Sequence, residues 1–120
     1  MNDKKNKTFW EALDNLVNSS KLMIDRPKGT HHPRFPEIFY PIDYGYLENT
    51  TSMDNHGIDV WRGTKQSPKI DAVIITVDLN KKDSEIKILI GCTEEEKTII
   101  MDFHNRGELM KGILMERQEK

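Results

Sequence analysis

Cysteine is almost absent from this chain of 120 residues, since Cys92 is the only one. A single thiol excludes an intrachain disulfide framework and a zinc site of the CxxC type. Long apolar runs are missing too: none approaches the roughly 20 residues that span a bilayer. Residues 1–8 also lack the apolar stretch of a secretory signal. We therefore expect a soluble protein of a reducing compartment, the cytoplasm, with no membrane as partner.

The chain also lacks an excess of positive charge. Lysine and arginine number 18 against 20 aspartates and glutamates, which gives a net charge of -2. Nonspecific nucleic-acid binders need a basic excess to displace counterions, so the sequence argues against nucleic acid as a partner. The apolar fraction of 36% and the charged fraction of 32% indicate a small core under a solvated surface. The length fits a single domain over residues 1–120.

Two segments have the pattern of amphipathic helices. In residues 8–19 the apolar side chains recur at helical spacing, which predicts one helix. Thr93 and Glu96 have the spacing of a capping box, and an apolar stripe follows them as far as Gly107. The sequence therefore predicts a second helix that begins at this box.

Short apolar and β-branched segments lie between and after these helices, and they predict strands. The third and fourth of them are joined by a polar stretch that suits a hairpin. The order of helix, several strands, helix and strand favours an α+β domain on an antiparallel, barrel-like sheet. The predicted strands are residues 21–25, 58–62, 70–79, 85–90 and 112–117.

One acidic pair lies in the polar loop before the second predicted strand. Asp54 and Asp59 flank a turn that would bring both carboxylates toward one point. Hard divalent cations prefer such oxygen ligands. Asp, Asn and Gly are also the usual residues of turns, so an ordinary loop explains this stretch as well.

A second acidic group lies at the predicted hairpin. Asp78 ends one strand, Asp83 lies in the turn, and Glu85 and Lys87 begin the return strand. Glu85 and Lys87 project from the same face because alternate residues of a strand do so. Two more acids and a cation would therefore converge, although gatekeeper charges at a solvated hairpin end give the same pattern.

Cations and phenols gather in the segment between the first two predicted strands. Residues 31–46 hold three prolines and five aromatic residues, which predicts an extended, aromatic-lined segment. Lys28 and Arg34 would supply positive charge for an anionic ligand, and Tyr40 and Tyr44 would supply hydroxyl donors. Core packing is the alternative role of these aromatics.

Taken in order, four motifs of this chain resemble those of the soluble family I inorganic pyrophosphatases. The tyrosine motif followed about eight residues later by an acidic loop is the most specific part of the resemblance. Weaker similarity covers residues 21–90 and resumes over residues 103–117. The motifs are PKGT at 27–30, YPIDYGY at 40–46, DNHGIDV at 54–60 and EIK at 85–87.

The resemblance implies an OB-like β-barrel with flanking helices, which binds Mg²⁺, or alternatively Mn²⁺, and hydrolyses pyrophosphate with an activated water. Asp54 and Asp59 match two metal ligands of the family's loop. Glu85 takes the place of a metal-binding aspartate. Asp78 is the better match for the remaining ligand, with Asp83 as a competing alignment.

The resemblance also implies roles for the other candidate residues. Tyr40 and Tyr44 match the family directly, and Lys87 falls on its phosphate-binding lysine. Arg34 is the arginine available in the shortened segment before Tyr40. His56 replaces an aspartate that interacts with the nucleophilic water, and an imidazole can still act as a base near neutral pH.

The chain departs from the family near its end as well. There the alignment offers His104 and Asn105 in place of a tyrosine and a lysine that contact phosphate, with Arg106 as a compensating cation. These departures keep two alternatives open: a hydrolase of another phosphoanhydride or phosphoester, and a degenerate member that binds metal and anion without turnover. Bacterial members of the family often form hexamers, so the resemblance also implies a homo-oligomer.

Overall fold

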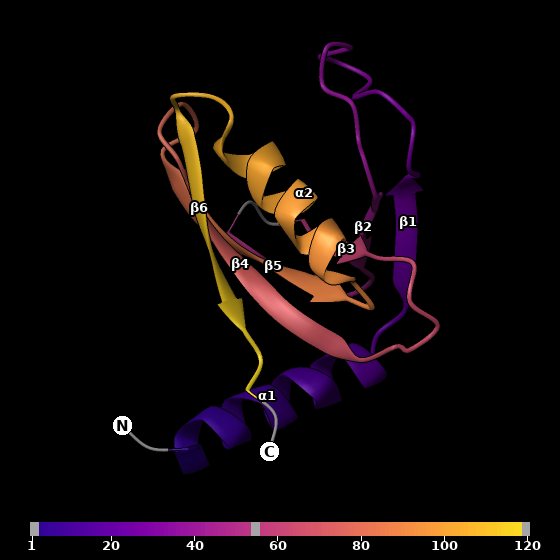
Figure 1. Cartoon of the computed structure of the whole chain (residues 1–120), viewed down its shortest axis with the longest axis vertical. Helices are drawn as coiled ribbons and strands as arrows, with labels where there is room; N and C mark the ends of the chain where they lie inside the picture. Colours follow the sequence, from indigo (N-terminus) through magenta and orange to yellow (C-terminus); the bar gives the residue numbers. More distant parts are fainter. Residues whose placement is uncertain (1–2, 54–55, 119–120) are drawn as a thin grey trace.

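Two helices cover opposite faces of one six-stranded sheet (Figure 1). The computed structural model describes residues 3–53 and 56–118, with the backbone alone for residues 3–6. The elements in chain order are α1 (Asp3–Asn18), β1 (Leu22–Arg26), β2 (Asp43–Leu47), β3 (Ile58–Arg62), β4 (Ile70–Asp78), β5 (Asp83–Ile90), α2 (Glu94–Asn105) and β6 (Met110–Glu116).

The sheet is mixed and open, which corrects the expectation of an antiparallel barrel. Its strand order is β1-β2-β3-β5-β4-β6, and β3 pairs with β5 in parallel while the other neighbours are antiparallel. The β4–β5 hairpin joins the sheet through β5, so β4 and β6 extend it away from β1. Within the described residues, β1 and β6 therefore form the two edges and do not pair with each other.

Alternation along the central strands divides the core between the two faces. On one face Val73 and Ile88 pack with Trp10, and other apolar side chains of α1 lie against this cluster. On the opposite face Ile74 and Leu89 belong to the cluster that α2 covers. Two core clusters form because the inner strands carry apolar side chains on both faces, and each face has to be shielded from water.

Most elements lie close to where the sequence places them. The structure has a strand over the predicted residues 58–62, and the Thr93 hydroxyl and the Glu96 carboxylate form both bonds of the predicted capping box. The first helix begins at Asp3 rather than residue 8. Lysine is a good helix former, so the lysine-rich start of the chain favours a helix without an apolar stripe.

Residues 27–42, which we call the arm, form a long hairpin-like excursion between β1 and β2. His31 and Phe39 form an isolated antiparallel bridge near its middle. Only residues 43–46 of the predicted extended segment of residues 31–46 join the sheet, as part of β2. Proline has no amide hydrogen to donate, and Pro33 and Pro36 lie at the arm's tip, where ladder pairing stops.

Glycine is required at one point where the backbones of β1 and β2 approach closely. A methylene group at Gly45 would clash with the carbonyl oxygen of Met23 on the neighbouring strand. Gly45 therefore lets Tyr44 and Tyr46 take their places on either side of it. Among the described residues, no helix is both long and apolar enough to cross a membrane.

Candidate functional site

A cleft of about 1200 Å³ opens between the arm, the β4–β5 turn and the end of α2. Figure 1 shows the arm and the β4–β5 turn rising on either side of α2. Residues of β2, β3 and β5 also line the cleft. Most of the candidate residues lie along this cleft, whereas Lys28 and Asp83 lie outside its lining, and Asp54 lies outside the described residues.

A cluster of four charged and polar side chains links three neighbouring strands at the cleft. Lys87 Nζ on β5 donates to Asp59 Oδ2 on β3 at 2.7 Å and to Glu85 Oε1 at 3.1 Å. Tyr44 on β2 donates its hydroxyl to the same Asp59 oxygen at 2.7 Å and accepts from Lys87 at 3.0 Å. Adjacent strands bring these residues together although 43 positions separate Tyr44 from Lys87.

Burial and charge together fix the protonation states of this cluster. Burial is the largest influence on the pKa of Lys87 and by itself lowers it. The Tyr44 oxygen and the Asp59 carboxylate outweigh burial and hold that pKa above its usual range. Burial raises the pKa of the Tyr44 phenol. At neutral pH Lys87 is therefore an ammonium, and Tyr44 is a neutral phenol.

The two alternative hairpin acids have different surroundings. Asp78 lines the cleft, and its Oδ1 accepts the backbone N–H groups of Asn80 and Lys81 at 2.9 and 3.1 Å. Asp83 Oδ2 lies 4.0 Å from Lys81 Nζ, outside the cleft lining. The turn therefore fixes the Asp78 carboxylate at the cleft.

Positive charge enters the cleft from the arm and from β1. Arg34 lines it from the arm, whereas Lys28 interacts through its backbone N–H, which donates to Asp43 at 2.7 Å. Arg26, which the sequence analysis did not propose, also lines the cleft. Its charge acts on Tyr40, whose pKa is raised by burial, with Arg26 opposing that increase. Residues 22–26 read LMIDR and do not alternate, so no local pattern pointed to Arg26, which lies just beyond the predicted strand of residues 21–25.

His56 lines the cleft as an exposed side chain at the end of the loop before β3. Its backbone carbonyl accepts the N–H of Ser52 at 2.9 Å, which closes this loop across its base. His56 therefore lines the same cleft as Asp59.

His104 and Asn105 are held by structural hydrogen bonds. His104 is 3% exposed, and its Nε2 accepts the indole N–H of Trp61 at 3.0 Å. Since indole is only a donor, neutral His104 has its proton on Nδ1, which lies 3.4 Å from the Met110 sulfur. Asn105 bonds the backbone of Met101 and Gly112. Both side chains tie α2 to its neighbours rather than offering charge to phosphate.

Burial, followed by the positive charge of Lys87, lowers the pKa of His104 to about 3. Its ring is consequently neutral throughout the physiological range. Arg106 also serves α2, because its guanidinium lies over the Phe103 ring at 5.5 Å and 3.5 Å from Asp102. The contacts of His104 and Asn105 are therefore structural, at positions where the sequence departs from the family's phosphate-contacting residues, and the contacts of Arg106 are with α2.

The cleft contains donors of the type that Mg²⁺ prefers, although no three histidine, cysteine or acidic residues in the described part of the chain form a metal-binding group. Mg²⁺ usually binds through one or two carboxylates, waters and substrate phosphates, so a complete protein cage is unnecessary. Asp59 and Asp78 both line the cleft and supply oxygen donors. The donor set fits Mg²⁺ bound together with a phosphate ligand.

Comparisons with known proteins show a structural similarity but no match at the level of sequence. Neither the known protein families nor the curated proteins include a match to this sequence. An inorganic pyrophosphatase from Neisseria gonorrhoeae has a solved structure similar to this one, with a TM-score of 0.65 and 15% sequence identity. The similarity covers 80% of this chain and 81% of that one. This chain therefore has a fold resembling that of an inorganic pyrophosphatase, with a cleft that contains both acids and cations.

Proposed function

We propose that this protein is a metal-dependent hydrolase that splits inorganic pyrophosphate into two phosphates. The cluster of Tyr44, Asp59 and Lys87 carries the proposal. It combines an ammonium suited to phosphate oxygens with a carboxylate suited to a cation, at the cleft of a pyrophosphatase-like fold. The Neisseria protein is named for the same reaction.

Mg²⁺ is the proposed cofactor, with Mn²⁺ as a second metal of the same oxygen-ligand chemistry. Asp59 and Asp78 would hold it, and Asp54 is a further candidate from the loop. When bound, the metal supplies charge to the phosphates and makes a water molecule more acidic. Asp78 is preferred over Asp83 because Asp78 is the acid at the cleft.

The remaining groups act on substrate and water. Lys87 binds a phosphate oxygen in exchange for one of its three present acceptors, Tyr44, Asp59 and Glu85. The Arg34 and Arg26 guanidiniums supply forked donors to the departing phosphate. His56 accepts the proton of the attacking water. Tyr44 is a positioning residue, because its hydroxyl holds Asp59 and Lys87 together.

Phosphate release from pyrophosphate tests this function. We expect release by the wild-type protein with Mg²⁺ or Mn²⁺ and none with EDTA. Asp78→Asn should lower the rate of phosphate release at least about tenfold, because the amide keeps the turn's acceptor oxygen but not the charge. The matched change Asp83→Asn should leave the rate unchanged. Absence of release with either metal, or release that EDTA does not diminish, would contradict the proposal.

A further inference from the structure

The arm presents an exposed aromatic ring to the cleft. Phe35 is 47% exposed and lines the cleft beside Arg34. Phe39 is on the same arm and equally exposed, at 45%, but lies outside the cleft lining. A large exposed ring at a cleft wall is available for stacking, so Phe35 and Phe39 form a natural comparison.

A column of rings runs from Phe35 to the charged cluster. The Phe35 and His32 centroids are 5.2 Å apart, His32 stacks on Tyr40 at 6.5 Å, and Tyr40 stacks on Tyr44 at 5.3 Å. Lys87 Nζ lies 5.6 Å from the Tyr44 ring centroid. Three rings, those of His32, Tyr40 and Tyr44, therefore separate Phe35 from Lys87, and pyrophosphate is too small to span them. Only His32 separates Phe35 from Tyr40, the ring on which the Arg26 charge acts.

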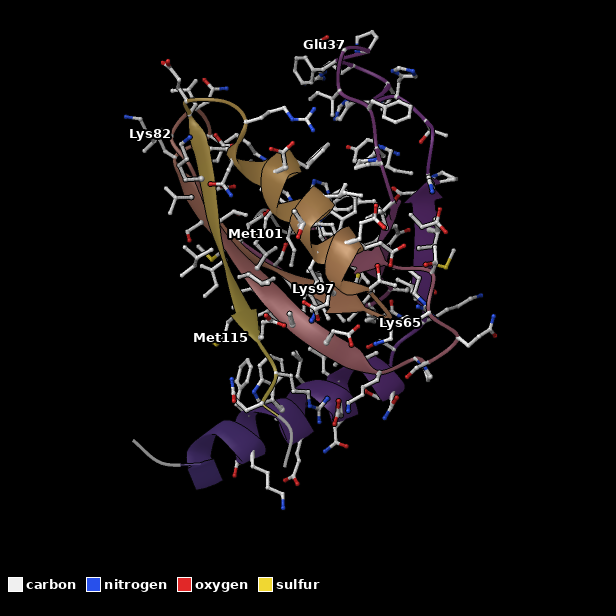
Figure 2. The ribbon with its side chains drawn as sticks, in the orientation of Figure 1. Glu37, Lys65, Lys82, Lys97, Met101 and Met115 are labelled. Atoms are coloured by element: carbon white, nitrogen blue, oxygen red, sulfur yellow. The ribbon has the colours of Figure 1, made fainter. Side chains whose placement is uncertain are left out.

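The tip of the arm is organised before any ligand binds. His32 Nδ1 accepts the backbone N–H groups of Arg34 and Phe35 at 3.0 and 3.2 Å. Pro33 and Pro36 restrict the backbone around these bonds. Figure 2 places Glu37 at the outer end of this tip. Because these bonds already hold the Phe35 backbone, stacking a ligand on its ring would lose less conformational entropy.

We propose that the cleft binds nucleoside diphosphates, with the base stacked on Phe35 and the diphosphate at Arg26 and Arg34. The volume of about 1200 Å³ exceeds the roughly 300–1,000 Å³ of ordinary organic-ligand pockets, so a nucleotide has room. Acids line the cleft as well, so the diphosphate enters as its Mg²⁺ complex. This inference rests on the diphosphate site of the proposed function and adds a nucleoside attached to that diphosphate.

Calorimetry with two ligands that resist hydrolysis tests the inference. The probes are the methylene-bridged analogue of ADP and the methyl ester of methylenediphosphonate, each with Mg²⁺. The two differ in the nucleoside and not in the bridged diphosphate. We expect the wild-type protein to bind the ADP analogue at least about fivefold more tightly, the lower end of base stacking on an aromatic ring.

Phe35→Ala should bring this affinity ratio close to one, and the matched change Phe39→Ala should leave it unchanged. Equal affinity of the two ligands for wild-type protein would overturn the inference, and so would an unchanged ratio in Phe35→Ala. Phosphate release from pyrophosphate is measured on the same samples. Failure of release contradicts the proposed function, whereas failure of the affinity ratio alone contradicts the nucleotide site.

Discussion

Two polar clusters lie side by side at the cleft and differ in charge. In one, Lys87 is an ammonium between Asp59 and Glu85. In the other, the Trp61 indole donates to a neutral His104. The clusters adjoin, since the Tyr44 and Trp61 ring centroids are 4.5 Å apart.

The comparison separates a site that can respond to a ligand from one that only supports the fold. An anion or cation entering the cleft changes the electrostatic balance around Lys87, because the partners of this ammonium are the acidic side chains of Asp59 and Glu85. His104 has partners on both ring nitrogens and carries no charge to exchange. We infer that the charged cluster is reactive and that the neutral cluster is structural.

The largest effect is expected for Lys87→Met. The change leaves Asp59 and Glu85 without their shared cation in a buried place, which should lower the free energy of unfolding by about 3–5 kcal/mol and abolish phosphate release. Lys97→Met is the matched control. Lys97 is also buried between two carboxylates, but Glu94 and Glu116 are 84% and 49% exposed. Losing this pair should cost only about 0–1 kcal/mol.

Urea unfolding and phosphate assays on both variants measure this difference. Figure 2 shows Lys97 on α2, among the side chains that face β6. Equal losses of stability in the two methionine variants, with activity kept in both, would contradict the claim that Lys87 supports the cluster and phosphate release while Lys97 does not.

A smaller effect, on pH dependence, is expected for His104. Its pKa is about 3 in the folded chain and about 6.5 when unfolded. Between these values the unfolded chain binds the additional proton, so stability falls as the pH falls. At pH 5 the loss should be about 2 kcal/mol relative to pH 7.

His104→Gln tests this pH dependence because glutamine offers an acceptor to the Trp61 indole and does not titrate in this range. The stability advantage of wild-type protein over His104→Gln at pH 7 should therefore shrink by about 2 kcal/mol at pH 5. Chemical unfolding at the two pH values provides the measurement. An advantage that stays constant would show that folding does not lower the pKa of His104.

The smallest effect is expected for Tyr44→Phe. Phenylalanine keeps the ring packing but lacks the hydroxyl that donates to Asp59 and accepts from Lys87. Stability should fall by about 1 kcal/mol, and the rate of phosphate release by about tenfold because the two charged groups lose their common support. An unchanged rate in steady-state assays would remove Tyr44 from the site.

Local pattern predicted the elements well, whereas contacts between distant residues had to come from the structure. The strand over residues 58–62 and the capping box at Thr93 follow from neighbouring residues alone. The parallel pairing of β3 with β5 depends on a crossover with no local signal, and it is this pairing that sets Asp59 beside Lys87.

The candidate site shows the same division. Tyr44, Asp59, Glu85 and Lys87 were selected from motifs, and the structure brings them together. The resemblance aligned His104 with a phosphate-contacting tyrosine of the family, as a departure, and His104 lies one helical turn after the buried Ile100. That spacing places it on the buried face of α2, a signal that helix periodicity offered.

The most direct test compares phosphate release by Asp59→Asn and His104→Gln in one assay with Mg²⁺ at neutral pH. Asp59→Asn removes charge from the reactive cluster and should lower the rate at least about 100-fold. His104→Gln changes only the structural cluster and should keep most of the rate. Equal losses in the two variants, or a larger loss in His104→Gln, would contradict the division between a reactive and a structural cluster.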